Sequence, residues 1–298
     1  MKRFIKLAII SFILLLLFAG CTYDKDNQPI SKTDTIRLCM PEYSSYVGSR
    51  INQANTFDVI AYIPKQDQVN SESVIMALTN NYSYSLNNGQ NDMAIQLSSV
   101  RLYSNGERGD LYSLTFEVAN SSPGLINFSE IAMTQIASGK RITHGVGNWC
   151  LDFREIVDSP NIELTQGFGL SSNPLDYFAF SFSNKSNGDV KILGTKTILN
   201  GFEMIPEMTV FKTYDDMTNN ASPIKENPTV ILPNQNKTFK FDYSKYSTID
   251  NPVFIKPLID YEVGDKDFSY LPLNAAQFLP IPDENILYEK FMAESPSE

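Results

Sequence analysis

The side chains of this sequence best suited to covalent or acid–base chemistry are three cysteines and a single histidine. Cys39 and Cys150 form an even pair, 111 residues apart. A disulfide between them would stabilise the fold by roughly 4–5 kcal/mol in the chain-entropy model, because it closes a long loop. The sequence leaves two alternatives open, a Cys39–Cys150 disulfide or two separately buried thiols, since spacing does not show proximity.

His144 lies in the segment Ile-Thr-His-Gly-Val-Gly-Asn-Trp, residues 142–149. A lone histidine can act as a general base, but the chain has no Gly-x-Ser-x-Gly elbow to supply a serine nucleophile. No Cys/His signature connects His144 with Cys150 either. We therefore expect His144 to be a loop or strand-edge histidine beside a buried Trp149, and the sequence predicts no catalytic residue and no enzyme.

The third cysteine, Cys21, ends the segment Phe18-Ala19-Gly20-Cys21. Before it come a positive stretch with Lys2, Arg3 and Lys6 and an apolar run, LAIISFILLLLFAG, at residues 7–20. Fourteen residues are too few to span a bilayer, which needs about 20, so the run is typical of a secretory signal peptide.

The same segment resembles the lipobox of bacterial lipoproteins, Leu-Ala/Ser-Gly/Ala-Cys, with Phe18 departing from its first position. The resemblance implies that the signal is cleaved before Cys21, that Cys21 is diacylglycerol-modified, and that membrane lipid is the anchor. It further implies an extracytoplasmic place on a bacterial membrane, either the outer membrane or the outer face of the cell membrane. Thr22, where Asp would favour inner-membrane retention, leaves that choice open.

The charge balance restricts the partners. The chain has 24 Lys+Arg against 34 Asp+Glu, a net charge of -10, and loss of residues 1–20 removes three cations and no acid to give -13. Nucleic-acid binding needs clustered cations, so we expect no nucleic-acid partner. An anionic membrane surface would repel the body, so the lipid has to hold the protein.

Sites for metals and nucleotide cofactors are not indicated. The chain has no Gly-rich phosphate loop, no Cys-x-x-Cys and no His-Glu-x-x-His. The densest acidic clusters, Asp215-Asp216 and the run from Asp260 to Asp267, lack EF-hand spacing and are interpreted as solvated loops. We predict no metal and no cofactor.

Four tyrosines near turn-rich sequence suit either a binding interface or ordinary strand packing: Tyr43, Tyr46, Tyr82 and Tyr84.

Short runs of alternating apolar and polar residues dominate the chain after residue 35 and predict half-buried strands. The runs are 57–63, 73–79, 99–103, 114–118, 178–182 and 238–243, and Asn/Gly/Ser/Pro clusters separate them. Helical periodicity is confined to the C-terminus, where Pro282-Asp283-Glu284 predicts the start of a short helix containing Leu287 and Phe291. The predicted fold class is all-β.

Two segments at an offset of 64 are alike: LTFEVANSSPGLINF at 114–128 and FAFSFSNKSNGDVKI at 178–192. They share Asn-x-Ser-x-Gly and predict a repeated strand–turn–strand hairpin. This block, with the later Pro233-Asn234 turn, resembles immunoglobulin-like modules of secreted bacterial lipoproteins. The resemblance implies two Ig-like β-sandwich modules.

The predicted organisation is a signal peptide at 1–20, a tether at 21–35, one module at 36–165 and a second at 166–298 that includes the C-terminal helix. A single larger sandwich is the alternative. The predicted function is a non-enzymatic, lipid-anchored envelope protein that is structural or binds a protein or glycan ligand. Two alternatives remain, a solute-binding lipoprotein of a transporter and a surface glycan-acting hydrolase.

Overall fold

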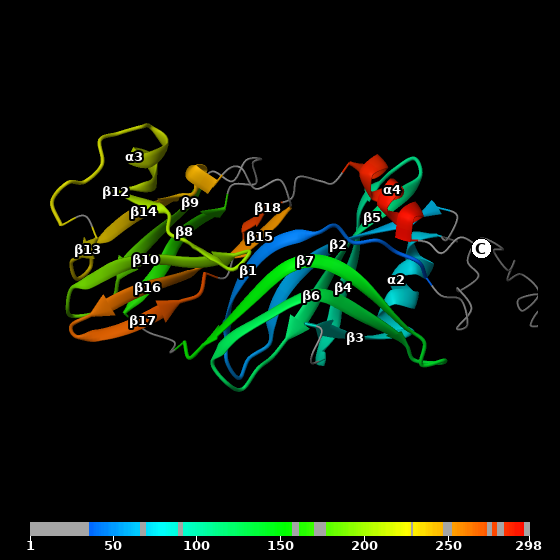
Figure 1. The fold of residues 1–298 in the computed structure, drawn as a ribbon. Helices are drawn as coiled ribbons and strands as arrows, with labels where there is room; N and C mark the ends of the chain where they lie inside the picture. Colours follow the sequence, from blue (N-terminus) through cyan, green and yellow to red (C-terminus); the bar gives the residue numbers. More distant parts are fainter. Residues whose placement is uncertain are drawn as a thin grey trace, which may run out of the picture.

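The computed structural model describes residues 36–65, 70–88, 92–156, 161–169, 177–227, 229–246, 252–272, 276–278 and 283–294. Within these ranges the chain is mostly β-strand, arranged in three sheets with a few short helices (Figure 1). The prediction of an all-β, sandwich-type chain with a short C-terminal helix is confirmed. None of the helices in the described ranges has the length and apolar character needed to cross a bilayer.

The largest sheet has nine strands in the order β18-β15-β1-β7-β6-β3-β4-β5-β2. In chain order these are β1 (Tyr43–Arg50), β2 (Asn55–Pro64), β3 (Tyr82–Asn87), β4 (Asp92–Asn105), β5 (Gly109–Val118), β6 (Gly124–Gln135), β7 (Arg141–Arg154), β15 (Val253–Lys256) and β18 (Ala276–Phe278). The sheet folds over on itself, because Phe57 on edge strand β2 reaches Trp149 on β7 with ring centroids 5.1 Å apart.

The other two sheets lie together in the second half of the molecule (Figure 1). One contains β10 (Val190–Leu199), β11 (Phe202–Met204), β13 (Val230–Ile231), β16 (Leu258–Val263) and β17 (Lys266–Tyr270). The other contains β8 (Ile162–Gly169), β9 (Tyr177–Asn184), β12 (Glu207–Phe211) and β14 (Asn236–Asp242). Apolar residues of both sheets pack in one cluster, including Phe180 and Phe241 from one sheet and Tyr261 from the other. This half is a β-sandwich.

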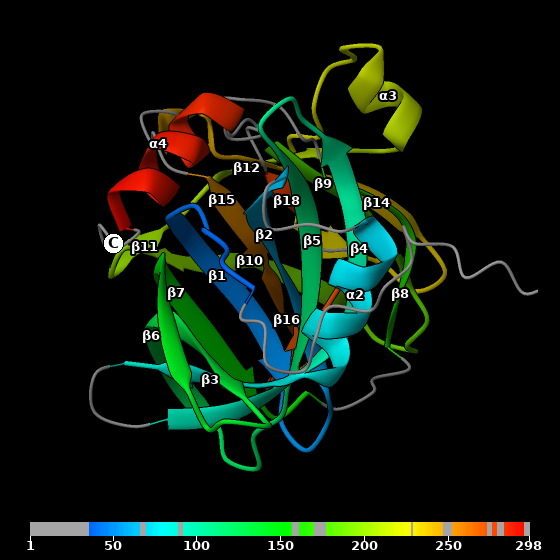
Figure 2. The ribbon, with the colours of Figure 1, turned by 90° about the vertical axis from the view of Figure 1, so that its right-hand side faces the viewer.

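Three α-helices occur in the described ranges: α2 (Ser71–Asn80), α3 (Tyr214–Thr218) and α4 (Glu284–Glu294); a 3-10 turn spans Ser244–Tyr246. Helix α4 confirms the predicted C-terminal helix. Its Leu287 and Phe291 pack against Cys39 and Tyr62, and the Glu284 carboxylate accepts backbone N–H groups of the β4–β5 turn. The two helices contact different faces of the nine-stranded sheet, because α2 packs in the cluster with Tyr84 and Phe116 and α4 packs in the cluster with Tyr62 and Leu111; both are visible in Figure 2.

The predicted strand at 73–79 is wrong, because these residues form α2. The Asn70 side chain caps the helix by accepting the Ser73 backbone N–H at 2.7 Å. Val74, Ala77 and Leu78 then lie on one buried face at helical spacing. A short apolar run fits strand and helix alike, and the cap decides between them.

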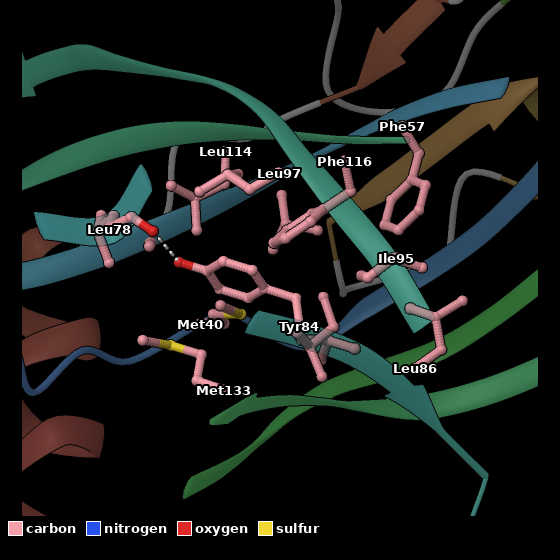
Figure 3. Packing of buried hydrophobic residues seen from close by; sticks show 14 of the residues in the cluster. Met40, Phe57, Leu78, Tyr84, Leu86, Ile95, Leu97, Leu114, Phe116 and Met133 are labelled. Atoms are coloured by element: carbon pink, nitrogen blue, oxygen red, sulfur yellow. Dashed lines mark hydrogen bonds between the residues drawn. The ribbon is translucent and has the colours of Figure 1, made fainter. Parts of the chain in front are cut away.

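The hydrophobic core of the first half is built around aromatic rings. Tyr84 packs edge-on against Phe116, with centroids 5.3 Å apart, and its hydroxyl donates to the Leu78 carbonyl of α2 at 2.7 Å (Figure 3). Met40 and Met133 pack in the same cluster. Helix α2 is thus held to the sheet by both apolar contact and a buried hydrogen bond.

The repeated segments form strand, turn and strand in both copies, but the hairpin interpretation is wrong. Strand β5 pairs with β2 and β4 while β6 pairs with β3 and β7, and β9 and β10 belong to different sheets. The turns differ too: the Asn184 side chain accepts the Ser186 backbone N–H, whereas the Asn120 side chain donates to the Ser122 carbonyl. Each turn therefore carries the chain between non-neighbouring strands.

Strand β1 joins the two halves. It runs parallel to β7 on one side and to β15 on the other, and all its residues except Arg50 are buried. Tyr43 and Val47 enter the first core, whereas Tyr46, on the opposite face, enters the second. The predicted boundary at 165/166 falls inside β8, which pairs only with β9.

Gly48 is where β1 lies closest to the second half. A Cβ there would lie 2.5 Å from Leu258 Cγ and 3.0 Å from the Lys256 carbonyl oxygen. We expect Gly48→Ala to lower the free energy of unfolding by about 1–3 kcal/mol, because buried Leu258 has to shift. Urea denaturation measures this.

Gly145→Ala is the matched control, since a Cβ at Gly145 on β7 meets nothing within 4 Å. Its unfolding free energy should stay within about 0.5 kcal/mol of the parent. Equal stability of the two variants would contradict a tight junction at Gly48.

Candidate functional site

The outer face of β6, β7 and β1 carries polar side chains in rows. Asn127 on β6 pairs with Cys150 on β7, and Cys150 pairs with Tyr46 on β1. In the next row Asn148 pairs with Ser44. Paired residues on neighbouring strands point to the same side of a sheet, so these side chains all lie opposite the first core.

The hairpin between β10 and β11 reaches this face from the second half. Its two-residue loop, Asn200-Gly201, has φ angles of 51° and 78° and joins the paired residues Leu199 and Phe202. Asn-Gly suits such a loop because both residues tolerate positive φ. Asn200 Oδ1 accepts the Ser44 hydroxyl at 3.0 Å and the Asn148 Nδ2–H at 3.2 Å, and these bonds hold the tip against β1 and β7.

A cavity of about 310 Å³ lies at the corner between the sheet face and the hairpin tip. Trp149 and Cys150 contribute to its wall, but the Trp149 ring packs in the first core and only 2% of the residue is exposed. Among the residues that the structure describes, no Asp, Glu, Lys or Arg lines the cavity. Its polar lining consists of amide and hydroxyl residues: Ser45, Asn88, Asn127, Ser129, Asn148 and Asn200. We name this cavity the amide pocket.

Cys150 is unsuited to nucleophilic chemistry. It is 5% exposed, and burial together with nearby Asp152 raises the pKa of its thiol to about 11. The thiolate is the reactive form of cysteine, so at neutral pH Cys150 is a neutral thiol in the pocket wall.

The structure does not bring Cys39 and Cys150 together. Cys39 lies in the cluster under α4 and its thiol donates to the Met40 carbonyl, whereas Cys150 packs with the second core. Both are buried thiols, which is the second of the two alternatives the sequence left open. Cys21 lies outside the described residues.

His144 is a buried residue within strand β7 and not a loop residue, which was one of the two positions expected. It is on β7, 8% exposed, and its Nε2 has no hydrogen-bond partner among the described residues. Burial, and then the charge of Lys290 on α4, lower the pKa of His144 to about 4. The imidazole is therefore neutral at physiological pH.

A second cavity, of about 590 Å³, is bordered by Arg154, Asp260 and Ser269. Arg154 forms ion pairs with Asp152 at 2.8 Å and with Asp260 at 3.1 Å. Tyr46 donates to Asp152 at 2.8 Å and Ser269 to Asp260 at 2.6 Å. Burial lowers the pKa of Arg154, but the hydrogen bond and charge of Asp152, with that of Asp260, outweigh it and raise the pKa.

This network connects β1 and β7 with β16 and β17. Each of its charges already has an opposite partner, which is the usual arrangement of partly buried ions that stabilise a fold. We assign it a structural role at the junction of the two halves.

The acidic clusters serve local structure. Asp216 completes a capping box with Thr213 at the start of α3, and Asp260 belongs to the Arg154 network. Among the described residues no group of three or more His, Cys, Asp or Glu side chains is placed to hold a metal ion.

The four tyrosines that the sequence singled out are buried, so an interface role for them is wrong. Tyr43 and Tyr82 accept backbone N–H groups of Ile60 and Ile36 at 2.9 and 2.8 Å. Tyr84 and Tyr46 donate to Leu78 and Asp152, as described above. These side chains are strand packing with satisfied hydroxyls.

The asparagines of the amide pocket were not identified from the sequence. Asn200-Gly201 between two apolar-alternating runs is a recognisable hairpin signal. Nothing in the sequence shows that this loop meets β6 and β7, because that contact joins residues more than 50 positions apart.

No protein-family model matches this sequence, and no curated protein matches it significantly. One match among solved structures is a chimeric titin Z1Z2 functionalized with a KLER exogenous peptide from decorin. It is 9% identical, covers 80% of this chain and 96% of that chain, and has a TM-score of 0.23. A TM-score this low supports no inference beyond what the strands themselves show.

The buried neutral state of His144 predicts a pH dependence of stability. The folded pKa is about 4 and the unfolded one 6.5, so the unfolded chain binds more protons between these values. Stability should therefore fall as pH drops from 6.5 towards 4, by up to about 3 kcal/mol. Urea denaturation at stepped pH measures it.

His144→Gln should remove this contribution, because the chain has no other histidine. Most carboxylates stay ionised between about pH 5 and 6.5, so comparison of the two proteins there isolates His144. Parallel pH profiles for parent and variant would contradict the buried neutral state.

Proposed function

We propose that this protein is a non-enzymatic, lipid-anchored binding protein of the bacterial envelope, held in the membrane through acylated Cys21. The observation that carries the proposal is Phe18-Ala19-Gly20-Cys21 directly after an apolar run with a positive start. In this proposal residues 21–35 are the tether, and Ig-like sandwich modules form the body outside the cytoplasm. Fifteen extended residues reach at most roughly 54 Å from the lipid.

A binding role is favoured over catalysis by the states of the candidate reactive groups. His144 is neutral and buried, and the Cys150 thiol has a raised pKa. Asp260, which lines the larger cavity together with Glu155 and Asp267, is held in an ion pair by Arg154. One of the three carboxyl groups at that cavity is therefore already committed to a structural contact.

The transporter alternative requires strands alternating with helices around a parallel sheet. The described residues instead form mostly antiparallel sheets with few helices. The architecture therefore favours a sandwich that presents loops and corners to a ligand.

Lipid attachment is tested by intact mass of the membrane-extracted protein. We expect cleavage before Cys21 and added acyl mass, and we expect Cys21→Ala to abolish both and release the chain from membranes. Thr22→Ala is the matched control, because it keeps the cysteine and should remain membrane-bound. A parent chain that is uncleaved, or cleaved without lipid, would refute the anchor.

A further inference from the structure

Several hydrogen-bonding groups of the amide pocket are available to a ligand. Asn200 Oδ1 and Asn148 Nδ2 are bonded to protein, but Asn200 Nδ2, Asn148 Oδ1, the Asn127 amide and the Ser129 hydroxyl have no protein partner among the described residues. An amide offers both donors and an acceptor, and a hydroxyl offers both on one atom. The pocket therefore presents mixed donors and acceptors within one small hollow.

The pocket is electrically neutral. None of the described residues that line it is ionised, and the Cys150 thiol in its wall stays protonated because its pKa is about 11. The whole chain is negative, which disfavours approach of anions. A neutral ligand matches the site, whereas a phosphate, a carboxylate or an acidic glycan finds no cation there.

The wall of the pocket has apolar parts as well as polar ones. Phe128 and Trp149 contribute to it, although they are only 4% and 2% exposed and their side chains belong to the core behind the sheet. A sugar ring is a neutral unit that needs several hydrogen-bond donors and acceptors around it, and the asparagines supply both.

Size and rigidity agree with this ligand class. A volume of about 310 Å³ is at the lower end of small-molecule sites, which span about 300–1,000 Å³, and suits one or two sugar rings. Strands carry Asn127 and Asn148, and two hydrogen bonds fix Asn200, so little order is lost on binding.

We propose that the amide pocket, at the corner of β6, β7 and the β10–β11 tip, is a binding site for a neutral carbohydrate, read through Asn127, Asn148 and Asn200. This assignment rests on the proposed function, because it names the ligand class of the body that Cys21 anchors. The ligand is a hexose unit of a neutral glycan, held by hydrogen bonds and not by charge.

The test is isothermal titration of the full-length protein in detergent micelles with maltotriose, cellotriose, mannotriose and chitotriose. Sialyllactose and a neutral tripeptide are run beside them. We expect at least one neutral trisaccharide to bind with a Kd of about 1 mM or tighter.

Asn127→Ala and Asn148→Ala should each weaken that binding about 2- to 10-fold, since each removes a hydrogen-bonding group. Asn187→Ala, at an exposed turn in the second half, is the matched control and should bind like the parent. Urea midpoints equal to the parent show that the pocket variants are folded.

Three outcomes would overturn the assignment: no neutral sugar bound at about 10 mM, binding unchanged in both pocket variants, or tighter binding of sialyllactose or the peptide. Failure here is distinguishable from failure of the proposed function. A lipidated chain that binds no sugar removes the carbohydrate assignment alone, and an unlipidated chain that binds sugar removes the anchor alone.

Discussion

The architecture depends on one strand that is buried on both faces. Residues of β1 alternate between two cores, Tyr43 and Val47 on one side and Tyr46 on the other. Parallel neighbours on both edges satisfy its backbone, and parallel pairing requires long connections between the strands. Segments from the middle and the end of the chain must therefore reach β1 before either core can close.

The polar residues of β1 form hydrogen bonds that offset the free-energy cost of burying them. Ser44 and Tyr46 donate to Asn200 and Asp152, and Ser45 accepts the Phe254 backbone N–H. Gly48 adds no side chain where Leu258 approaches. Buried hydroxyls cost little when they are hydrogen-bonded, so a serine-rich strand can occupy the centre of the molecule.

The amide pocket and the Arg154 network are two consequences of the same junction. Bringing β10–β11 against β1 and β7 leaves a corner that neither sheet fills. Asn148 and Asn200 form a hydrogen bond across this corner. Two residues further along β7, Asp152 and Arg154 use charge to bind β16 and β17. The junction thus borders a cavity at each end: the one beside the asparagines is lined by amide and hydroxyl groups, and the one beside Arg154 is lined by ionic groups.

Sequence patterns predicted most strands correctly where alternation was strong, as at 57–63, 114–118 and 178–182, because period-two burial is a local property. They failed at 73–79, where a short apolar run fits either period and the Asn70 cap decides. They also missed β1, since Tyr-Ser-Ser-Tyr carries little apolar signal. Sequence patterns did not predict which strands pair with β5, β6, β9 and β10. A turn sequence determines the local direction of the chain but not which strand becomes the hydrogen-bonded neighbour.

Residue types and near-neighbour spacing are enough to predict the all-β class, the short C-terminal helix, the acidic balance and the lipobox-like segment on which the proposed anchor rests. Three other features emerge only from the folded chain: Cys39 and Cys150 stay apart, His144 is neutral, and Asn127, Asn148 and Asn200 surround one cavity. Each of these depends on burial or on contacts between distant segments, and such contacts exist only after β1 has joined the two cores.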